Sequence, residues 1–136
     1  MSAPNINSED AKTFKALFSG YSQAHGTFEI KETDPQTGKI KGNARTIRRG
    51  ATLQEWEEHL AGGPKGLGTI PLLDDGVSVT WAAIDIDDTQ IDHTMLEAEV
   101  RELGLPLVVC RSKSGGAHCY LFLVTPVPAK KRGGGP

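Results

Sequence analysis

Two short stretches of this 136-residue chain contain residue types that could bind a metal ion and a phosphate group. The first stretch is residues 83–88, in which Asp85 and Asp87 stand two positions apart in an apolar strand pattern. The second is residues 111–118, a Ser/Lys/Gly segment that leads into a strand headed by His118. Alternate residues of a strand share a face, so the two carboxylates are expected to lie together. The two stretches predict a divalent-metal site beside a phosphate-binding loop.

The carboxylate pair has two interpretations. Two ionised carboxylates on one face of a partly buried strand repel each other, and a bound cation offsets the repulsion. Mg²⁺ or Mn²⁺ would supply that charge, and two such ions about 3.5–4 Å apart can activate a 3′-hydroxyl and bridge a nucleoside triphosphate. In the second interpretation, the two carboxylates simply lie on the solvent side of a one-sided sheet, which gives the same alternation. The apolar neighbours Trp81, Ile84 and Ile86 predict a central, buried strand, which favours the metal interpretation.

The Ser/Lys/Gly segment also has two interpretations. Its hydroxyls, ammonium group and flexible backbone N–H groups suit a triphosphate, although the Walker A pattern is absent. Taken alone, the segment equally fits a glycine-rich hairpin turn. By strand parity, His118 is expected to share a face with Tyr120 and, across the turn, with Arg111. The predicted nucleotide-binding residues are Arg111, Ser112, Lys113, Ser114, Gly115, Gly116 and His118.

Composition sets limits on the class of protein. The length corresponds to one domain, and the formal charge of −2 does not by itself indicate a nucleic-acid binder. No apolar run approaches the ~20 residues of a membrane helix, and residues 1–7 show no basic region followed by an apolar core. We therefore expect no secretory signal and a cytoplasmic protein without a membrane partner. One cluster of basic residues could contact nucleic acid or simply form a solvated surface: Lys39, Lys41, Arg45, Arg48 and Arg49.

Cys110 and Cys119 do not have the spacing of a zinc site. If residues 107–111 and 118–124 form a hairpin, the two cysteines fall nearly opposite each other. In a cytoplasmic protein, two buried reduced thiols are then expected rather than a disulfide.

The elements that position these residues follow from apolar periodicity and from local turn chemistry. Asn7 or Ser8 can cap the first helix, and Thr52 and Glu55 form a capping box for the second. Asp75 and Gly76 predict a hairpin turn. The expected helices cover residues 8–18, 52–61 and 92–103, and the expected strands cover 26–31, a second strand after the turn at 34–39, 69–73, 77–87, 107–111 and 117–124.

This order of elements predicts an α+β fold. We expect an RRM-like antiparallel or mixed sheet with helices on one face and with Asp85, Asp87, His118 and Tyr120 on its open face. Residues 1–7 are predicted to be disordered, residues 8–128 to form the domain, and residues 129–136 to form a flexible basic and glycine-rich tail.

The ordered set of motifs resembles the archaeo-eukaryotic primase superfamily, the primase-polymerases, and within it the primase domain of TOTE conflict systems. Residues 85–87 match the family's acid–hydrophobic–acid motif, and residues 112–118 match its second motif, which ends in a histidine. The segments 56–60 and 68–73 are similar to the family's lead-in, so the resemblance covers residues 14–129. It implies that this chain is the N-terminal part of a primase-polymerase catalytic domain.

The resemblance implies a role for each candidate residue. Asp85 and Asp87 would hold the metal ions, and His118 would complete the catalytic set. The loop at 112–116 would bind the incoming nucleoside triphosphate, and the basic residues 39–49 would contact a DNA template or primer. The family's third motif, a later carboxylate, has no match because no Asp or Glu follows Glu102. We therefore expect a chain truncated before that motif, and possible completion by a helicase or another chain.

Two functions remain open on the sequence alone. The first is a primase-polymerase nucleotidyltransferase that acts in replication or in a mobile-element or phage conflict system. The second is a catalytically inactive remnant that binds nucleotides or nucleic acid. A rolling-circle nuclease lacks support because residues 117–119 hold no paired histidines, and an RNA-binding RRM lacks support because acids occupy the expected open face.

Overall fold

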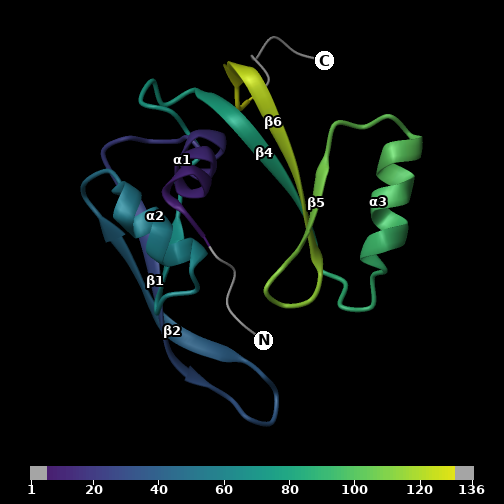
Figure 1. Ribbon diagram of the computed structural model, residues 1–136, viewed down its shortest axis with the longest axis horizontal. Coiled ribbons are helices and arrows are strands. Elements are labelled where there is room, and N and C mark those ends of the chain that lie inside the picture. Colours follow the sequence, from purple (N-terminus) through teal and green to yellow (C-terminus); the bar gives the residue numbers. More distant parts are fainter. Residues whose placement is uncertain (1–5, 131–136) are drawn as a thin grey trace. The chain divides into compact units, whose positions relative to one another are not determined.

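The structure is a computed structural model that describes residues 6–130. Residues 1–5 and 131–136, which include most of the predicted disordered start and basic tail, lie outside the described residues. The described part contains the helices α1–α3 and the strands β1–β6 (Figure 1). It divides into two compact units, one made of residues up to 79 together with those from 127, and one made of residues 80–126.

The first unit contains one three-stranded sheet and two helices. Its elements in chain order are α1 (Ser8–Leu17), β1 (His25–Thr33), β2 (Ile40–Ile47), α2 (Leu53–Leu60) and β3 (Lys65–Gly68). The strand order is β2-β1-β3, and β1 pairs antiparallel with both neighbours. Helix α1 packs against α2, and α2 packs against β3. The buried residues Ala11, Ala24 and Trp56 form the core of this unit.

Local capping chemistry fixes both helix starts, as predicted. Asn7 accepts a hydrogen bond from the Asp10 N–H, and the Asp10 carboxylate accepts from the Asn7 N–H. Thr52 and Glu55 form the same reciprocal box at α2. Each box satisfies two backbone N–H groups that the helix leaves unpaired.

The turn at residues 34–39 joins β1 and β2, as predicted. The Asp34 carboxylate accepts from the Gln36 N–H at 2.8 Å, and the Asp34 N–H donates to the Lys39 carbonyl at 2.8 Å. Gly38 has a φ of +72°, which only glycine adopts without strain. In Figure 1 the resulting β1–β2 hairpin extends past the end of α2.

The predicted strand at residues 69–73 is wrong. The strand is β3, which ends at Gly68 and pairs with β1 from Gly26↔Gly68 to Glu29↔Lys65. Beyond it, Pro71 has no N–H to donate, and the Ile70 carbonyl accepts instead from the Tyr21 N–H at 2.9 Å. The predicted turn at Gly76 is present, with a φ of +69°, but it follows this irregular segment rather than a strand.

The second unit is built on another three-stranded sheet. Its elements are β4 (Ser78–Ile86), which begins in the first unit, α3 (His93–Glu102), β5 (Val108–Arg111) and β6 (Ala117–Pro128), which ends in the first unit. The strand order is β4-β6-β5, and α3 packs against β5. The small core contains Val100, Ala117 and Cys119.

Strand β6 is longer than predicted, because it continues through Pro126 to Pro128. The Ala129 N–H donates to the Val77 carbonyl at 2.8 Å, toward β4. Successive backbone N–H groups of a strand point to opposite edges, so the nitrogens of Pro126 and Pro128 point away from the edge that Ala129 uses, toward the edge that faces β5. Strand β5 pairs only with residues 117–120 there, so the prolines interrupt none of its hydrogen bonds.

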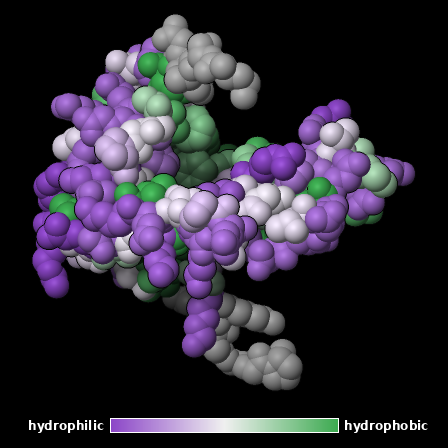
Figure 2. All heavy atoms as spheres, turned by 90° about the horizontal axis from the view of Figure 1, so that it is seen from below, coloured by the Kyte–Doolittle hydropathy of each residue, from purple (hydrophilic) through white to green (hydrophobic). Residues whose placement is uncertain are grey.

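The predicted α+β class is confirmed, with the strands arranged in two three-stranded sheets. Among the described residues, no helix is long and apolar enough to cross a membrane. Hydrophilic side chains cover most of the face seen in Figure 2, where apolar side chains form small patches.

Candidate functional site

The predicted acidic residues lie at one end of β4. Asp85 is in β4 and Asp87 is one residue past its end, and both are exposed. The prediction that this strand is buried and central is wrong, because β6 is the middle strand of the sheet and β4 is at its edge. Residues 82–85 are exposed, so water can reach the carboxylates directly.

A chain of polar contacts joins Asp85 to two residues of β6. The Nε2 atom of His118 lies 3.4 Å from Asp85 Oδ1, and His118 Nδ1 lies 3.2 Å from the Tyr120 hydroxyl. A carboxylate only accepts hydrogen bonds, which favours the tautomer with hydrogen on Nε2. Nδ1 then accepts from the Tyr120 hydroxyl, so Asp85 and Tyr120 together orient the imidazole ring. This part of the predicted open face is confirmed.

The surroundings of Tyr120 keep its hydroxyl protonated. Burial raises the pKa of Tyr120 above its ordinary value, and the nearby Cys110 and Asp85 raise it further. The ring also makes an edge contact with Trp81 of β4, with centroids 6.2 Å apart. Tyr120 is therefore a fixed hydrogen-bond donor to His118.

The Ser/Lys/Gly segment at residues 112–116 forms the turn between β5 and β6. The Ser112 N–H donates to the Gly116 carbonyl at 2.9 Å, and the Gly115 N–H donates to the Ser112 carbonyl at 3.0 Å. Ser112 is buried, and its hydroxyl lies 3.3 Å from that of Ser114. Lys113 and Ser114 are exposed. The N–H groups of Ser112 and Gly115 are therefore used within the turn and are not available to a phosphate group.

The turn lies directly against the segment that carries Asp87. A Cβ atom added at Gly116 would stand 2.2 Å from the Ile86 carbonyl oxygen and 3.4 Å from the Asp88 nitrogen. Only a residue without a side chain permits so close an approach of two backbones. The structure therefore places the Ser/Lys/Gly turn against the backbone of residues 86–88, the segment that includes Asp87.

His93 is a residue of this site that no sequence pattern marked. It is the first residue of α3, and its Nε2 lies 2.7 Å from the Gly116 carbonyl oxygen. A lone histidine at a helix start carries no signal of such a contact, because the contact depends on the tertiary fold.

Two register predictions on β5 are wrong. The pairing is Cys110↔His118 and Arg111↔Ala117, so Arg111 lies on the opposite sheet face from His118. Cys110, and not Arg111, shares a sheet face with His118. Cys119 lies on the opposite face from Cys110, so the two cysteines are not opposite each other. The cause is a turn in which Ser112 pairs with Gly116, which shifts the expected register by one residue.

The thiols also differ from the prediction of two buried cysteines. Cys119 is buried and Cys110 is exposed, and both are free. Partial burial raises the pKa of Cys110, with a further contribution from Cys119. Its thiol is therefore a poor candidate for a nucleophile.

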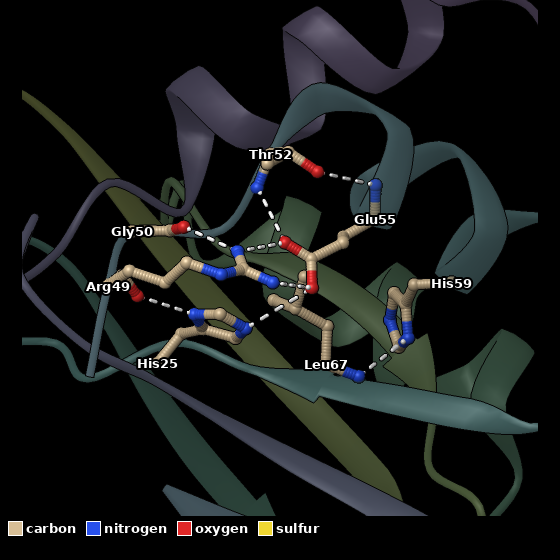
Figure 3. Close-up of polar contacts among 7 residues, drawn as sticks. All are labelled: His25, Arg49, Gly50, Thr52, Glu55, His59 and Leu67. Carbon is tan, nitrogen blue, oxygen red and sulfur yellow. Dashed lines mark hydrogen bonds and ion pairs between the residues drawn. The ribbon is translucent and has the colours of Figure 1, made fainter. Parts of the chain in front are cut away.

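The basic residues 39–49 lie on and around β2, an edge strand of the other sheet. Lys41 and Arg45 lie on one face of β2, because they are an even number of residues apart. Arg49 is different, because its guanidinium forms two hydrogen bonds, at 2.6 and 3.0 Å, with the Glu55 carboxylate (Figure 3). This pairing gives Arg49 a structural role that the sequence did not predict.

The Arg49–Glu55 pair joins the end of β2 to α2. The Arg49 carbonyl oxygen lies 2.8 Å from Nδ1 of the buried His25, and Glu55 Oε2 lies 3.6 Å from its Nε2 (Figure 3). The Arg49 guanidinium, helped by the N–H and hydroxyl groups of Thr52, lowers the pKa of Glu55 to about 2. Arg49 therefore anchors the start of α2.

The fold and the site together define an α+β domain with a carboxylate pair beside a Ser/Lys/Gly turn and a histidine. The family described as TOTE conflict system, Archaeo-Eukaryotic Primase domain, matches residues 10–133. The chain therefore belongs to this family, which confirms the resemblance and makes it a primase-type nucleotidyltransferase domain. No curated protein matches the chain.

Proposed function

We propose that this domain transfers a nucleotide from a nucleoside triphosphate to a 3′-hydroxyl of DNA, and that Asp85, Asp87, His118 and residues 112–116 carry the reaction. The close approach of Gly116 to the Ile86–Asp88 backbone is the observation that supports this most. It supports the proposal because the turn that would bind phosphates lies against the segment that includes Asp87, one of the residues that would bind metal. Family membership supports the same class of reaction.

The carboxylate pair fits a divalent metal by its chemistry. Mg²⁺ and Mn²⁺ prefer oxygen ligands, and Mg²⁺ is commonly held by one or two carboxylates, substrate phosphates and water. Within residues 6–130, no group of three or more His, Cys, Asp or Glu side chains could hold a metal. Asp85 and Asp87 would then bind an ion whose other ligands come from the triphosphate and water. When bound, the ion stabilises charge on the phosphates and lowers the pKa of the attacking hydroxyl.

His118 and the turn would hold the triphosphate. The His118 Nε2–H faces Asp85 at 3.4 Å, so a phosphate oxygen bound beside Asp85 would be within its reach. Lys113 adds a positive charge, and Ser112 and Ser114 add hydroxyl donors. Arg111 is not part of this proposed set, because it lies on the other face of the sheet.

The basic side of β2 is the proposed contact with DNA. Lys41 and Arg45 point to the same side of an exposed edge strand, with Lys39 before the strand and Arg48 after it. The whole chain carries a net charge of −2, so the proposed contact rests on these four basic residues and not on the overall charge. Lysine and arginine on an exposed strand would bind phosphates of the DNA backbone without reading its sequence.

A second candidate is nucleotide binding without transfer. It is favoured by the finding that, among the described residues, no three His, Cys, Asp or Glu side chains form a group that could hold a metal ion. Such a domain would bind a triphosphate and metal at the same residues and would not extend a primer.

Primer extension distinguishes the two candidates. The wild-type chain would be incubated with a primed DNA template, labelled deoxynucleoside triphosphates and Mn²⁺ or Mg²⁺. We expect extension by the wild type, none by Asp85→Asn, and normal extension by the matched control Glu97→Gln, which alters an exposed ion pair with Arg101 on α3. Triphosphate binding without extension would favour the binding function, and extension by Asp85→Asn would refute the proposed site.

A further inference from the structure

The contact between His93 and Gly116 joins α3 to the turn that follows β5. The distance from His93 Nε2 to the Gly116 carbonyl oxygen is 2.7 Å. A carbonyl oxygen only accepts, so Nε2 carries the hydrogen. The same oxygen accepts from the Ser112 N–H at 2.9 Å, so two donors use its two lone pairs.

His93 is itself held close to the carboxylate strand. Asp92 caps α3 by accepting from the Met95 N–H at 3.0 Å. The preceding turn is closed by Asp88, which accepts from the Gln90 N–H at 2.9 Å and from the Ile91 N–H at 3.2 Å. Only this short, hydrogen-bonded connection separates His93 from Asp87.

We propose that His93 is a positioning residue, which fixes the turn at residues 112–116 against the end of β4 and so sets where a triphosphate would meet the metal-binding carboxylates. This inference rests on the proposed function. Gly116 takes part in both contacts that define the position of the turn, since its Cα faces Ile86 and its carbonyl oxygen faces His93. A displacement of the Gly116 backbone would also displace the fully buried Ala117 and then His118, because the three residues are consecutive.

Conservative substitution separates this role from simple packing. His93→Gln retains an N–H donor at nearly the reach of Nε2, whereas His93→Ala removes the donor. Thr94→Ala is the matched control, because Thr94 is the next exposed residue of the same helix turn. Melting temperature and circular dichroism would show that each variant is folded.

The first measurement needs no ligand. In the wild type, long-range ¹H–¹⁵N spectra should show His93 protonated at Nε2, and the amide hydrogens of Ser112 and Gly115 should exchange slowly. His93→Ala should speed exchange of these two amides about 3- to 10-fold, the range expected for loss of one hydrogen bond. An Nε2 without hydrogen, or unchanged exchange in His93→Ala, would overturn the proposal.

The second measurement is calorimetric titration with a deoxynucleoside triphosphate and Mn²⁺. We expect about 3- to 10-fold weaker binding by His93→Ala, recovery in His93→Gln, and no change in Thr94→Ala. Normal binding by His93→Ala would overturn the positioning role while leaving the proposed function intact. No binding by the folded wild type would refute the proposed function, and the exchange data alone would then decide whether His93 positions the turn.

Discussion

Replacing Gly116 by alanine tests how closely the turn must approach β4. The new Cβ would stand 2.2 Å from the Ile86 carbonyl oxygen, and a backbone carbonyl cannot move aside as a flexible side chain can. Because real Cβ contacts stay beyond 3.0 Å, the two backbones would have to separate by at least about 0.8 Å. That separation would also lengthen the hydrogen bonds that the Gly116 carbonyl accepts from His93 and Ser112.

This separation has two expected effects. Overpacking of this kind costs about 1–3 kcal/mol of folding free energy, which lowers the melting temperature of a chain of this size by about 3–10 °C. A shift near 1 Å in a reacting group can lower turnover by about 100-fold. We therefore expect Gly116→Ala to lose at least about tenfold in triphosphate affinity and more in primer extension.

Gly66→Ala is the matched control for this experiment. Its added Cβ would stand 3.6 Å from the nearest atom, the Phe28 carbonyl oxygen, which is an ordinary contact. It therefore reproduces the general effect of replacing glycine in a strand without a collision. Differential scanning calorimetry and triphosphate titration would be run on both variants. Equal melting temperatures and equal affinities for the two variants would refute the close approach of the turn to β4.

Three further predictions concern other parts of the chain. Tyr120→Phe removes the donor 3.2 Å from His118 Nδ1, so triphosphate affinity measured by calorimetry should fall about 3- to 10-fold; unchanged affinity would contradict the orienting role. The folded-state pKa of Glu55 is lowered to about 2, so its contribution of about 1–2 kcal/mol is present above pH 4.5 and lost as the pH falls toward 2. Denaturant unfolding across that range should show a smaller loss of stability in Glu55→Gln than in the wild type, and parallel curves would argue against the pair. Lys41→Ala and Arg45→Ala should each reduce the salt dependence of DNA binding, measured by fluorescence anisotropy, by a slope of about 1, and an unchanged slope would exclude phosphate contacts there.

Local chemistry explains which elements could be predicted from the sequence. The capping boxes at Asn7 and Thr52 and the turn at Asp34 depend on residues within three or four positions, and all three are present. The strand predicted at residues 69–73 failed because pairing with β1 selects β3 instead. That choice depends on a partner about forty residues away in the chain, which local patterns do not contain.

Strand alternation explains which site residues could be predicted. The shared face of Asp85, His118 and Tyr120 follows from period-two alternation on β4 and β6, and the contacts confirm it. The face of Arg111 depends on how the turn at residues 112–116 closes, and a difference of one residue moves a side chain to the opposite face. His93 reaches the site through tertiary packing of α3, so no local pattern could indicate it.

The central claim is that the carboxylate pair and the turn form one metal-dependent triphosphate site. Calorimetric titration of the chain with a deoxynucleoside triphosphate, with and without Mn²⁺, tests it most directly. The double variant Asp85→Ala/Asp87→Ala, shown to be folded, is the control. We predict binding that requires Mn²⁺ and is lost in the double variant. Binding that is independent of Mn²⁺, or that survives in the double variant, would contradict a shared site.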